Sequence, residues 1–338
     1  MKHYDNKAKR TLAAYVSVFF LMVMGIAISG YLSYRNFEQS FRRQAEHQIS
    51  GIAELKVNEL VNWRNERLGD AEFLYHNPVF SAFVQRYFEN SGDIEAQTQL
   101  LAWLGHFQFY DQYDRVRLLD ATGAERLSIP TTPDSLKSHL MQDAIACLRS
   151  GKVTFLDFYS DTGAGGEIHL SILVPIFTEQ SNNRPLGVLV LRVDPQIYLY
   201  PYIQNWPTLS TSAETLLVRR DGEDVLFLNE LRFEQDAALT LRYPLTDTEL
   251  PAVKAVLGQT GVVEGVDYRG EPVLADVRAV PDSPWFLVSK MDTAEVYAPL
   301  RTRLWQTLGM IGMAIFVAGA AVITVWRQQR ILFYRTQA

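Results

Sequence analysis

Cysteine is nearly absent from this sequence, and so are the short motifs that accompany most enzymatic chemistry. Of the 338 residues only Cys147 is a cysteine, so no internal disulfide can form and a cysteine-rich metal site is excluded. The sequence contains no G-x-S-x-G, H-E-x-x-H, P-loop or C-x-x-C motif. Its six histidines are scattered, without the spacing of metal ligands. These absences favour a protein that is not an enzyme and that uses no cofactor and no metal.

Charged residues are missing from two long stretches. Residues 11–33 ("TLAAYVSVFFLMVMGIAISGYLS") and 304–326 ("LWQTLGMIGMAIFVAGAAVITVW") contain none. Each stretch is long enough to cross roughly 30 Å of hydrocarbon as a helix, so we predict two transmembrane helices. The alternatives are a cleaved signal peptide for the first stretch and a buried helix for the second. The first stretch is long for a signal peptide and ends without a clear small-residue cleavage site.

The charges that flank these stretches predict the orientation of the chain. Residues 1–10 and 327–338 each carry a net charge of +3, so both tails are expected to be cytoplasmic by the positive-inside bias. Residues 34–303 then lie outside. Because the overall charge is −6, the chain between the two tails carries −12. This acidity argues against nucleic acid as a partner and against tight docking on anionic lipid.

The outer segment begins with a long helix and continues with a repeated unit. In residues 34–78 apolar residues recur at three- and four-residue steps, which predicts an amphipathic helix that leaves the membrane and ends near Pro78. After two shorter helical stretches, the order strand, turn, strand, helix, three strands occurs twice. We assign a distal repeat to residues 79–207 and a proximal repeat, next to the membrane, to residues 208–303. Each repeat predicts a five-stranded antiparallel sheet with helices on one face, so the fold class is α+β.

Polar and aromatic side chains alternate with apolar ones in the distal repeat. In "EIHLSILVP" the side chains of Glu167, His169 and Ser171 share one face of a strand. This face either meets the solvent or lines a small-molecule pocket beneath the helices that carry Phe107 and Tyr113. The expected ligand is a carboxylate or an amine, and arginines beside the first turn suit a carboxylate. The candidate binding residues are Tyr110, Arg117, Arg126, Asp157, Tyr159, Asp161, His169 and Ser171.

The order of these elements resembles a known family. The resemblance is carried by "LVNWRNERLGDAEFLYHNPVF" in the long helix, by "EIHLSILVPIF" and "PLGVLVLRVDP" in the distal repeat, and by "EGVDYRGEPVLADVRAVPDSPWFLVSKMDTAEVYAPLR" in the proximal repeat. These stretches resemble double Cache (dCache) domains, which are tandem PAS-like extracytoplasmic sensors of bacterial histidine kinases, diguanylate cyclases and chemoreceptors. The resemblance implies that the distal repeat binds a small ligand and that the proximal repeat relays the change.

One motif of the family is incomplete in this chain. Members of the family that bind amino acids have a tyrosine followed by Arg-x-Trp-Tyr before the first strand. Tyr110 and Arg115 stand at compatible spacing, but Val116, Arg117 and Leu118 come next, so the Trp-Tyr pair is absent. The resemblance therefore implies a sensor without assigning its ligand.

We predict that the chain is the sensor region of a receptor in the bacterial inner membrane. The long helix is expected to pair two copies into a homodimer and to transmit ligand binding to a cytoplasmic output domain or partner protein. The twelve residues after Trp326 are too few for an output domain, so the chain is either the sensor portion of a longer receptor or acts through a separate protein. The alternative functions are a membrane-anchored scaffold without a ligand and an outer-surface hydrolase.

Overall fold

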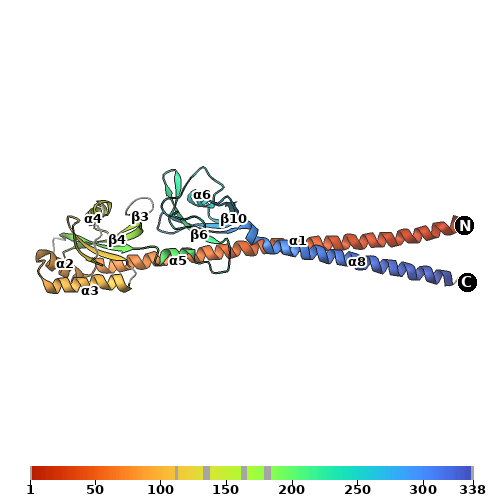
Figure 1. Ribbon diagram of the computed structural model, residues 1–338, viewed down its shortest axis with the longest axis horizontal. Helices are drawn as coiled ribbons and strands as arrows, with labels where there is room; N and C mark the ends of the chain where they lie inside the picture. Colours follow the sequence, from red (N-terminus) through yellow and green to blue (C-terminus); the bar gives the residue numbers. More distant parts are fainter. Residues whose placement is uncertain (1, 111–112, 132–137, 161–165, 179–183, 336–338) are drawn as a thin grey trace. The chain divides into compact units, whose positions relative to one another are not determined.

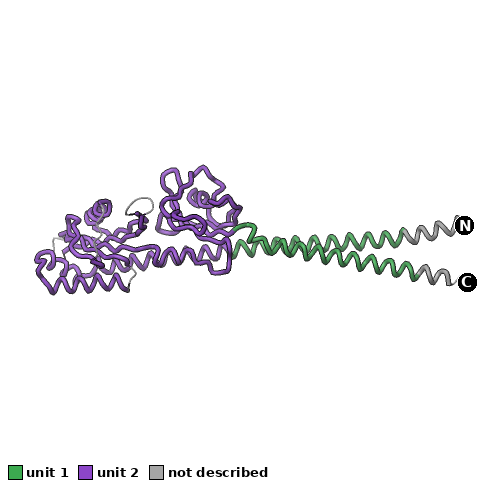
Figure 2. The backbone as a smooth tube through the Cα atoms, viewed as in Figure 1, with its two compact units in different colours: residues 1–48, 292–338 green, residues 49–291 purple. Residues whose placement is uncertain are grey.

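The computed structural model describes residues 2–110, 113–131, 138–160, 166–178 and 184–335. It divides into two compact units, which Figure 2 distinguishes by colour. The terminal unit consists of residues 1–48 and 292–338, and the sheet-containing unit consists of residues 49–291.

The first element is a single long helix, α1 (Lys2–Tyr75). It ends at Tyr75, just before Asn77-Pro78, close to the predicted end. Proline cannot continue a preceding helix but is well placed in the first turn of a new one. Helix α2 (Pro78–Glu89) therefore begins there, and the side chain of Asn77 caps it by accepting hydrogen bonds from the backbone N–H groups of Val79 and Phe80.

The distal repeat contains the predicted five-stranded antiparallel sheet, together with α3 (Ile94–Tyr110) and α4 (Ser138–Ser150) (Figure 1). The strands lie in the order β2-β1-β5-β4-β3. Close approach of β1 and β5 requires glycine at position 187, because a Cβ atom there would overlap the carbonyl oxygen of Leu119. The strands are β1 (Arg115–Asp120), β2 (Glu125–Ile129), β3 (Thr154–Ser160), β4 (Ile168–Phe177) and β5 (Pro185–Val193).

The two faces of this sheet have different partners. On one face, residues such as Leu170 and Ile172 of β4 belong to a core shared with Leu60 of α1 and with helices α2 and α3. On the other face, Leu173 packs in a smaller cluster with residues of α4. The sheet is thus a layer between α1 and α4 (Figure 1). The strict alternation along β4 decides which side chains face α4.

The proximal repeat follows the short helix α5 (Leu199–Gln204) and has the same strand order with one addition. Its sheet runs β8-β7-β6-β11-β10-β9. The additional strand β8 (Arg242–Pro244) pairs with β7 but is only three residues long, too short for a recognisable alternation in the sequence. The other elements are β6 (Glu214–Asp221), β7 (Asp224–Phe227), α6 (Pro251–Val256), β9 (Gly261–Val266), β10 (Pro272–Ala279) and β11 (Trp285–Asp292).

The terminal unit contains the two apolar helical segments. Helix α7 (Thr293–Val296) leads to α8 (Ala298–Arg335), and α1 and α8 are the two helices long and apolar enough to cross a membrane among the described residues. The two helices pack against each other at glycines. A Cβ atom on Gly30 would overlap the side chain of Ile311, and one on Gly319 would lie 3.4 Å from the ring of Phe19. Small residues at such crossings let two helix backbones approach closely.

A buried lysine fastens α1 to the connection between the two repeats. The Nζ atom of Lys56 donates hydrogen bonds to the carbonyl oxygens of Tyr202, Ile203 and Asn205, at 3.0, 2.8 and 2.8 Å. These carbonyls belong to the C-terminal end of α5, where a helix has unsatisfied acceptors and favours a cation. Burial lowers the pKa of Lys56 to about 8, although the charge of Glu59 partly opposes this shift.

This lowered pKa predicts a stability that rises with pH. Between pH 8 and the ordinary value of 10.5, the unfolded chain binds more protons at this lysine than the folded chain, so the wild type gains stability as the pH increases. The melting temperature of the wild type, measured relative to Lys56→Met from pH 7 to 10, should therefore increase above pH 8. Lys254→Met, at a lysine that donates to a single carbonyl, is the matched control. A difference that is constant with pH would contradict the prediction.

Candidate functional site

Basic side chains gather on the α4 face of the distal sheet. Arg115 and Arg117 come from β1, Arg192 from β5 and His169 from β4, and all four are buried. The strand register aligns three polar residues across the sheet, because Arg115 is opposite Arg192 and Arg192 is opposite Ser171. Arg117 lies two residues further along β1, on the same face. The result is a buried, cation-rich surface, called here the arginine face.

Acidic residues contact this face from its edges. The guanidinium of Arg192 donates to Asp114 at 2.7 Å, and Arg117 lies 3.6 Å from Glu125. Arg115 also donates to the carbonyl oxygen of Pro130 at 3.5 Å. Arg192 and Arg117 thus each lie at ion-pair distance from a carboxylate. Closely spaced buried cations are stable only where anions approach them.

Aromatic and hydroxyl groups complete the arginine face. The hydroxyl of Tyr159 on β3 is hydrogen-bonded to Ser171 at 2.8 Å, and the ring of Tyr159 contacts that of His169. His139, in the first turn of α4, packs edge-on against the same tyrosine ring. The positive end of the α4 dipole therefore lies beside Tyr159, which adds to the preference for an anion.

The structure brings together half of the candidate residues that the sequence suggested. Arg117, Tyr159, His169 and Ser171 lie on the arginine face. Arg126 does not, because its half-exposed side chain forms an ion pair with Asp120 at 3.1 Å beside the β1–β2 turn. The side chain of Tyr110 and the whole of Asp161 lie outside the described residues.

The structure places Phe107 and Tyr113 on the opposite face of the sheet from His169 and Ser171, so the polar face of β4 does not lie beneath the helix that carries Phe107. Phe107 and Tyr113 face α1 and belong to its core, where the hydroxyl of Tyr113 donates to Asp70 at 3.0 Å. A groove of ≈550 Å³ does lie between α1 and α3, lined by residues including Phe73, Trp103 and Phe107. It is separate from the arginine face because it lies on the opposite side of the sheet.

Asp157 has a different position from the one expected, since it links the two repeats. A bulge in β3 between Leu156 and Tyr159 turns this side chain away from the arginine face. Its carboxylate forms an ion pair with Arg219 of β6 and accepts a hydrogen bond of 2.7 Å from the indole nitrogen of Trp285 on β11. Arg219 and Trp285 are cross-strand partners in the proximal sheet. These contacts define the repeat junction.

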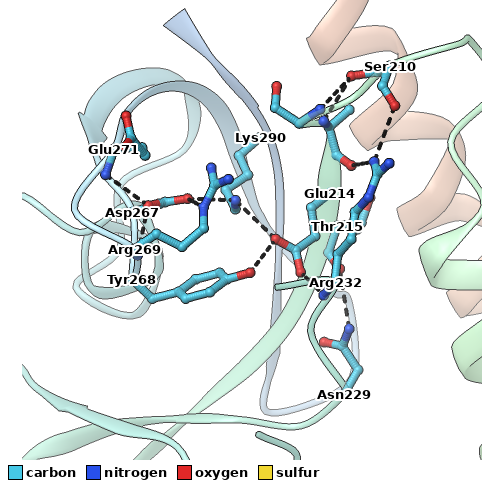
Figure 3. Close-up of polar contacts among 12 residues, drawn as sticks. Ser210, Glu214, Thr215, Asn229, Arg232, Asp267, Tyr268, Arg269, Glu271 and Lys290 are labelled. Atoms are coloured by element: carbon cyan, nitrogen blue, oxygen red, sulfur yellow. Dashed lines mark hydrogen bonds and ion pairs between the residues drawn. The ribbon is translucent and has the colours of Figure 1, made fainter. Parts of the chain in front are cut away.

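A second polar cluster lies inside the proximal repeat (Figure 3). The ammonium group of Lys290 is fully buried between the carboxylates of Glu214, at 3.0 Å, and Asp267, at 2.7 Å. Tyr268 donates its hydroxyl proton to Glu214 at 2.8 Å, and the side chain of Arg269 donates to Asp267 at 2.7 Å. These five residues form what is called here the lysine cage.

Every carboxylate oxygen in the lysine cage has a partner. The second oxygen of Glu214 accepts from the backbone N–H of Arg232 at 2.6 Å, and the second oxygen of Asp267 accepts from those of Arg269 and Glu271. Burial alone would raise the pKa of Asp267, but hydrogen bonds and charge from Lys290 and Arg269 outweigh burial and hold that pKa below its ordinary value. Burial and the neighbouring Glu214 carboxylate raise the pKa of Tyr268, so its hydroxyl stays protonated and donates.

Sequence reasoning did not identify Arg192 or the lysine cage, and it named Arg115 only as part of the incomplete amino-acid motif. Arg192 and Lys290 each follow a run of apolar residues in their strand, two residues before Asp194 and Asp292 respectively. A cation in a strand that is buried on both faces requires a partner. A basic residue after an apolar run is therefore the signal that could have identified both residues. The identity of those partners depends on strand register and on a distant turn, which the pattern does not specify.

Two tandem sheets on one long helix, with apolar helices at both ends of the chain, are the architecture of a membrane-anchored tandem sensor. The chain belongs to the Cache domain family, since the dCache_1 family model matches residues 37–300. The predicted family and the predicted role as a ligand-binding sensor are thereby confirmed. None of the curated proteins that were compared matches this chain.

Solved structures share the fold at low sequence identity. The ligand-binding domain of the Pseudomonas aeruginosa PAO1 amino acid chemoreceptor PctC, in complex with GABA, has 18% identity and a TM-score of 0.50, with 73% of this chain and 99% of that chain covered. The ligand-binding domain of the amino acid chemoreceptor PctB from the same organism, in complex with L-Arg, has 19% identity and a TM-score of 0.50, with 75% and 97% covered. At these identities the likeness concerns the fold.

The lowered pKa of Asp267 predicts how its contribution to stability depends on pH. A carboxylate whose folded-state pKa lies below its ordinary value of 3.8 stabilises the fold above that value and loses this effect as the pH falls through the folded-state pKa. Asp267→Asn should cost about 3 kcal/mol at pH 7, because it removes one of the two carboxylates that balance the buried charge of Lys290. Chemical denaturation at pH 7, 4 and 3 should show the difference from the wild type shrinking below pH 4. Asp247→Asn, at an exposed position, is the control, and an unchanged difference at pH 3 would refute the assignment.

Proposed function

We propose that the distal repeat binds a small molecule carrying a carboxylate or a similar anionic group, and that binding is relayed through the proximal repeat to the second apolar helix. The supporting observation is the arginine face, where Arg115, Arg117, Arg192 and His169 are buried on one side of one sheet. Guanidinium groups bind carboxylates through paired, charge-assisted hydrogen bonds, and burial strengthens such bonds. The ligands named for the two similar structures, GABA and L-Arg, both contain a carboxylate.

The proposed binding residues combine predicted and newly found positions. Arg115, Arg117 and Arg192 would hold the anion. Tyr159 and Ser171, already joined by a hydrogen bond, would orient the remainder of the ligand beside the first turn of α4. Arg117 stands where the amino-acid motif would have its tryptophan, so an aromatic side chain is replaced by a third cation. This substitution favours a ligand with more negative charge than a neutral amino acid carries.

The relay would run through the repeat junction. Tyr159 contacts the arginine face, and Asp157, two residues away on the same bulged strand, contacts Arg219 and Trp285 of the proximal sheet. The strand β11 that carries Trp285 continues directly into α7 and α8. A ligand that moves β3 therefore acts on the strand that precedes the second apolar helix, provided that it binds the two conformations with different affinity.

Membrane placement and assembly follow the same proposal. The basic tails would be cytoplasmic, with residues 34–303 outside, and an output domain or partner protein would receive the signal at the inner face. Two copies would pair along α1. Leu55 and Phe73 on this helix are 53% and 60% exposed, and their separation of eighteen residues is five whole helical turns, so both lie on one face. Exposed apolar residues in a row on one helix favour a helical partner.

The first test is ligand binding by the full chain in detergent. A thermal-shift screen of dicarboxylates, monocarboxylates, amino acids and amines should give its largest increases in melting temperature with carboxylates. Arg117→Met should weaken the binding of the best carboxylate at least about tenfold, because a charge-assisted hydrogen bond is lost. Arg117 is the preferred site because its neighbour Glu125 is partly exposed and tolerates the loss, whereas Asp114 beside Arg192 is more deeply buried.

Arg220→Met is the matched control, since Arg220 lies on the proximal sheet and its side chain is 55% exposed. It should leave the affinity unchanged. The proposal fails if no carboxylate raises the melting temperature of the wild type, and a scaffold without a ligand would then be favoured. It also fails if Arg117→Met binds the best carboxylate as tightly as the wild type does.

The second test addresses the relay. Hydrogen exchange of β11 should slow when the best carboxylate from the screen binds the wild-type chain. Asp157→Asn keeps the shape of the side chain but removes the charge that faces Arg219, so it should retain ligand affinity within about threefold and lose the slowing in β11. Asp221→Asn is the control, because it breaks an exposed ion pair with Arg242 inside the proximal sheet. This variant should keep the ligand-induced slowing of hydrogen exchange in β11. Unaltered slowing in Asp157→Asn would exclude this route.

A further inference from the structure

The lysine cage and the arginine face occupy equivalent places in the two repeats. The five strands that the sheets share have the same order, with β1 corresponding to β6 and β5 to β11. Arg192 lies two residues before Asp194 at the end of β5, and Lys290 lies two residues before Asp292 at the end of β11. By this topology Lys290 is the counterpart of Arg192.

The cross-strand partners of these two cations are also equivalent in position but opposite in charge. In the distal sheet, Arg192 is paired with Arg115, and in the proximal sheet, Lys290 is paired with Glu214. Glu214 shares its face of β6 with Leu216, which packs in the α6 cluster, just as Arg115 shares its face of β1 with Leu119, which packs in the α4 cluster. The proximal repeat therefore has a carboxylate of its own where the distal repeat has a cation.

The surroundings of Glu214 resemble those of a bound carboxylate. Its two oxygens receive three contacts, from Lys290 at 3.0 Å, from the Tyr268 hydroxyl at 2.8 Å and from the Arg232 backbone N–H at 2.6 Å. An ammonium, a phenol and a backbone amide converging on one carboxylate are the groups with which proteins bind free carboxylates. The side chain is only 3% exposed, so this arrangement is closed to solvent.

We propose that Glu214 is a built-in substitute for a carboxylate ligand in the proximal repeat. Lys290, Tyr268 and the Arg232 amide form a carboxylate-binding site that the chain itself occupies permanently. The proximal repeat is thus held in an occupied state and follows the distal repeat instead of sensing on its own. The link to the distal repeat rests on the proposed function, whereas the carboxylate site around Glu214 rests on the contacts of the proximal repeat alone.

The test is chemical rescue in the full chain in detergent. Glu214→Ala removes a CH₂–COO⁻ fragment, whose free equivalent is acetate. The variant should melt roughly 10 °C or more below the wild type, because Lys290 loses one of its two anions. Acetate should restore at least about half of that loss in a saturable manner. Methylammonium at equal ionic strength should not, because it is a cation and accepts no hydrogen bond. Chloride should restore less than acetate, because a single spherical ion cannot occupy both oxygen positions, one contacted by Lys290 and Tyr268 and the other by the Arg232 amide.

Two controls separate this inference from the proposed function. The same titrations in an Arg117→Met background weaken any response of the arginine face, so a rescue that persists there at unchanged acetate concentration belongs to the proximal site. Glu223→Ala, whose side chain is 91% exposed, should neither lose stability nor respond to acetate. Equal shifts by acetate in Glu214→Ala and in the wild type would overturn the inference, and so would a folded Glu214→Ala variant that acetate does not stabilise.

An isosteric variant covers the case in which Glu214→Ala does not fold. Glu214→Gln preserves the shape of the side chain and removes its charge, so it should lower the melting temperature. Adding Lys290→Met should recover part of that loss, because the unbalanced cation is then removed as well. A Glu214→Gln variant as stable as the wild type would show that the carboxylate charge is not required and would overturn the inference.

Discussion

Both sheets of this protein pack against the same helix, α1, and the positions of the two sheets depend on this shared packing. The apolar side chains of α1, among them Ala53, Leu60 and Trp63, belong to one core that contains residues of the distal sheet, such as Leu118, and of the proximal sheet, such as Leu217. Because protein interiors are close-packed, a shift of either sheet along α1 requires the other to adjust. Lys56 reinforces this dependence by holding the end of α5 against the same helix.

The opposite faces of the two sheets carry the chemistry, and they differ in how charge is balanced. A buried cation next to another cation, as in the Arg115 and Arg192 pair, is costly unless anions approach it. A buried Lys290 next to Glu214 is balanced without help from outside the chain. The equivalent cross-strand pair is therefore two cations in the distal sheet and a cation with an anion in the proximal sheet. The repeat junction at Asp157 connects these two sheets.

The fold was largely predictable because its information is local and repeated. Three signals were local: uncharged stretches of membrane length, the Asn77-Pro78 break and the alternation along β4. Each depends only on neighbouring residues, and the structure contains the corresponding element. The same alternation correctly placed His169 and Ser171 on one face of β4. It failed for Asp157, because a bulge in β3 shifts the side chains between Leu156 and Tyr159 and no residue in that strand marks the bulge.

The sequence by itself determined the class of the protein, two apolar helices enclosing a tandem α+β sensor, because hydrophobic periodicity and the repeat order are properties of neighbouring residues. Only the tertiary structure decided which charges meet. Arg115, Arg117 and Arg192 come together because β1 pairs with β5, and Asp267, between β9 and β10, forms an ion pair with Lys290 on β11. Electrostatic pairing depends on distances of 3 to 4 Å between residues far apart in the chain, and such distances are fixed by strand order and register.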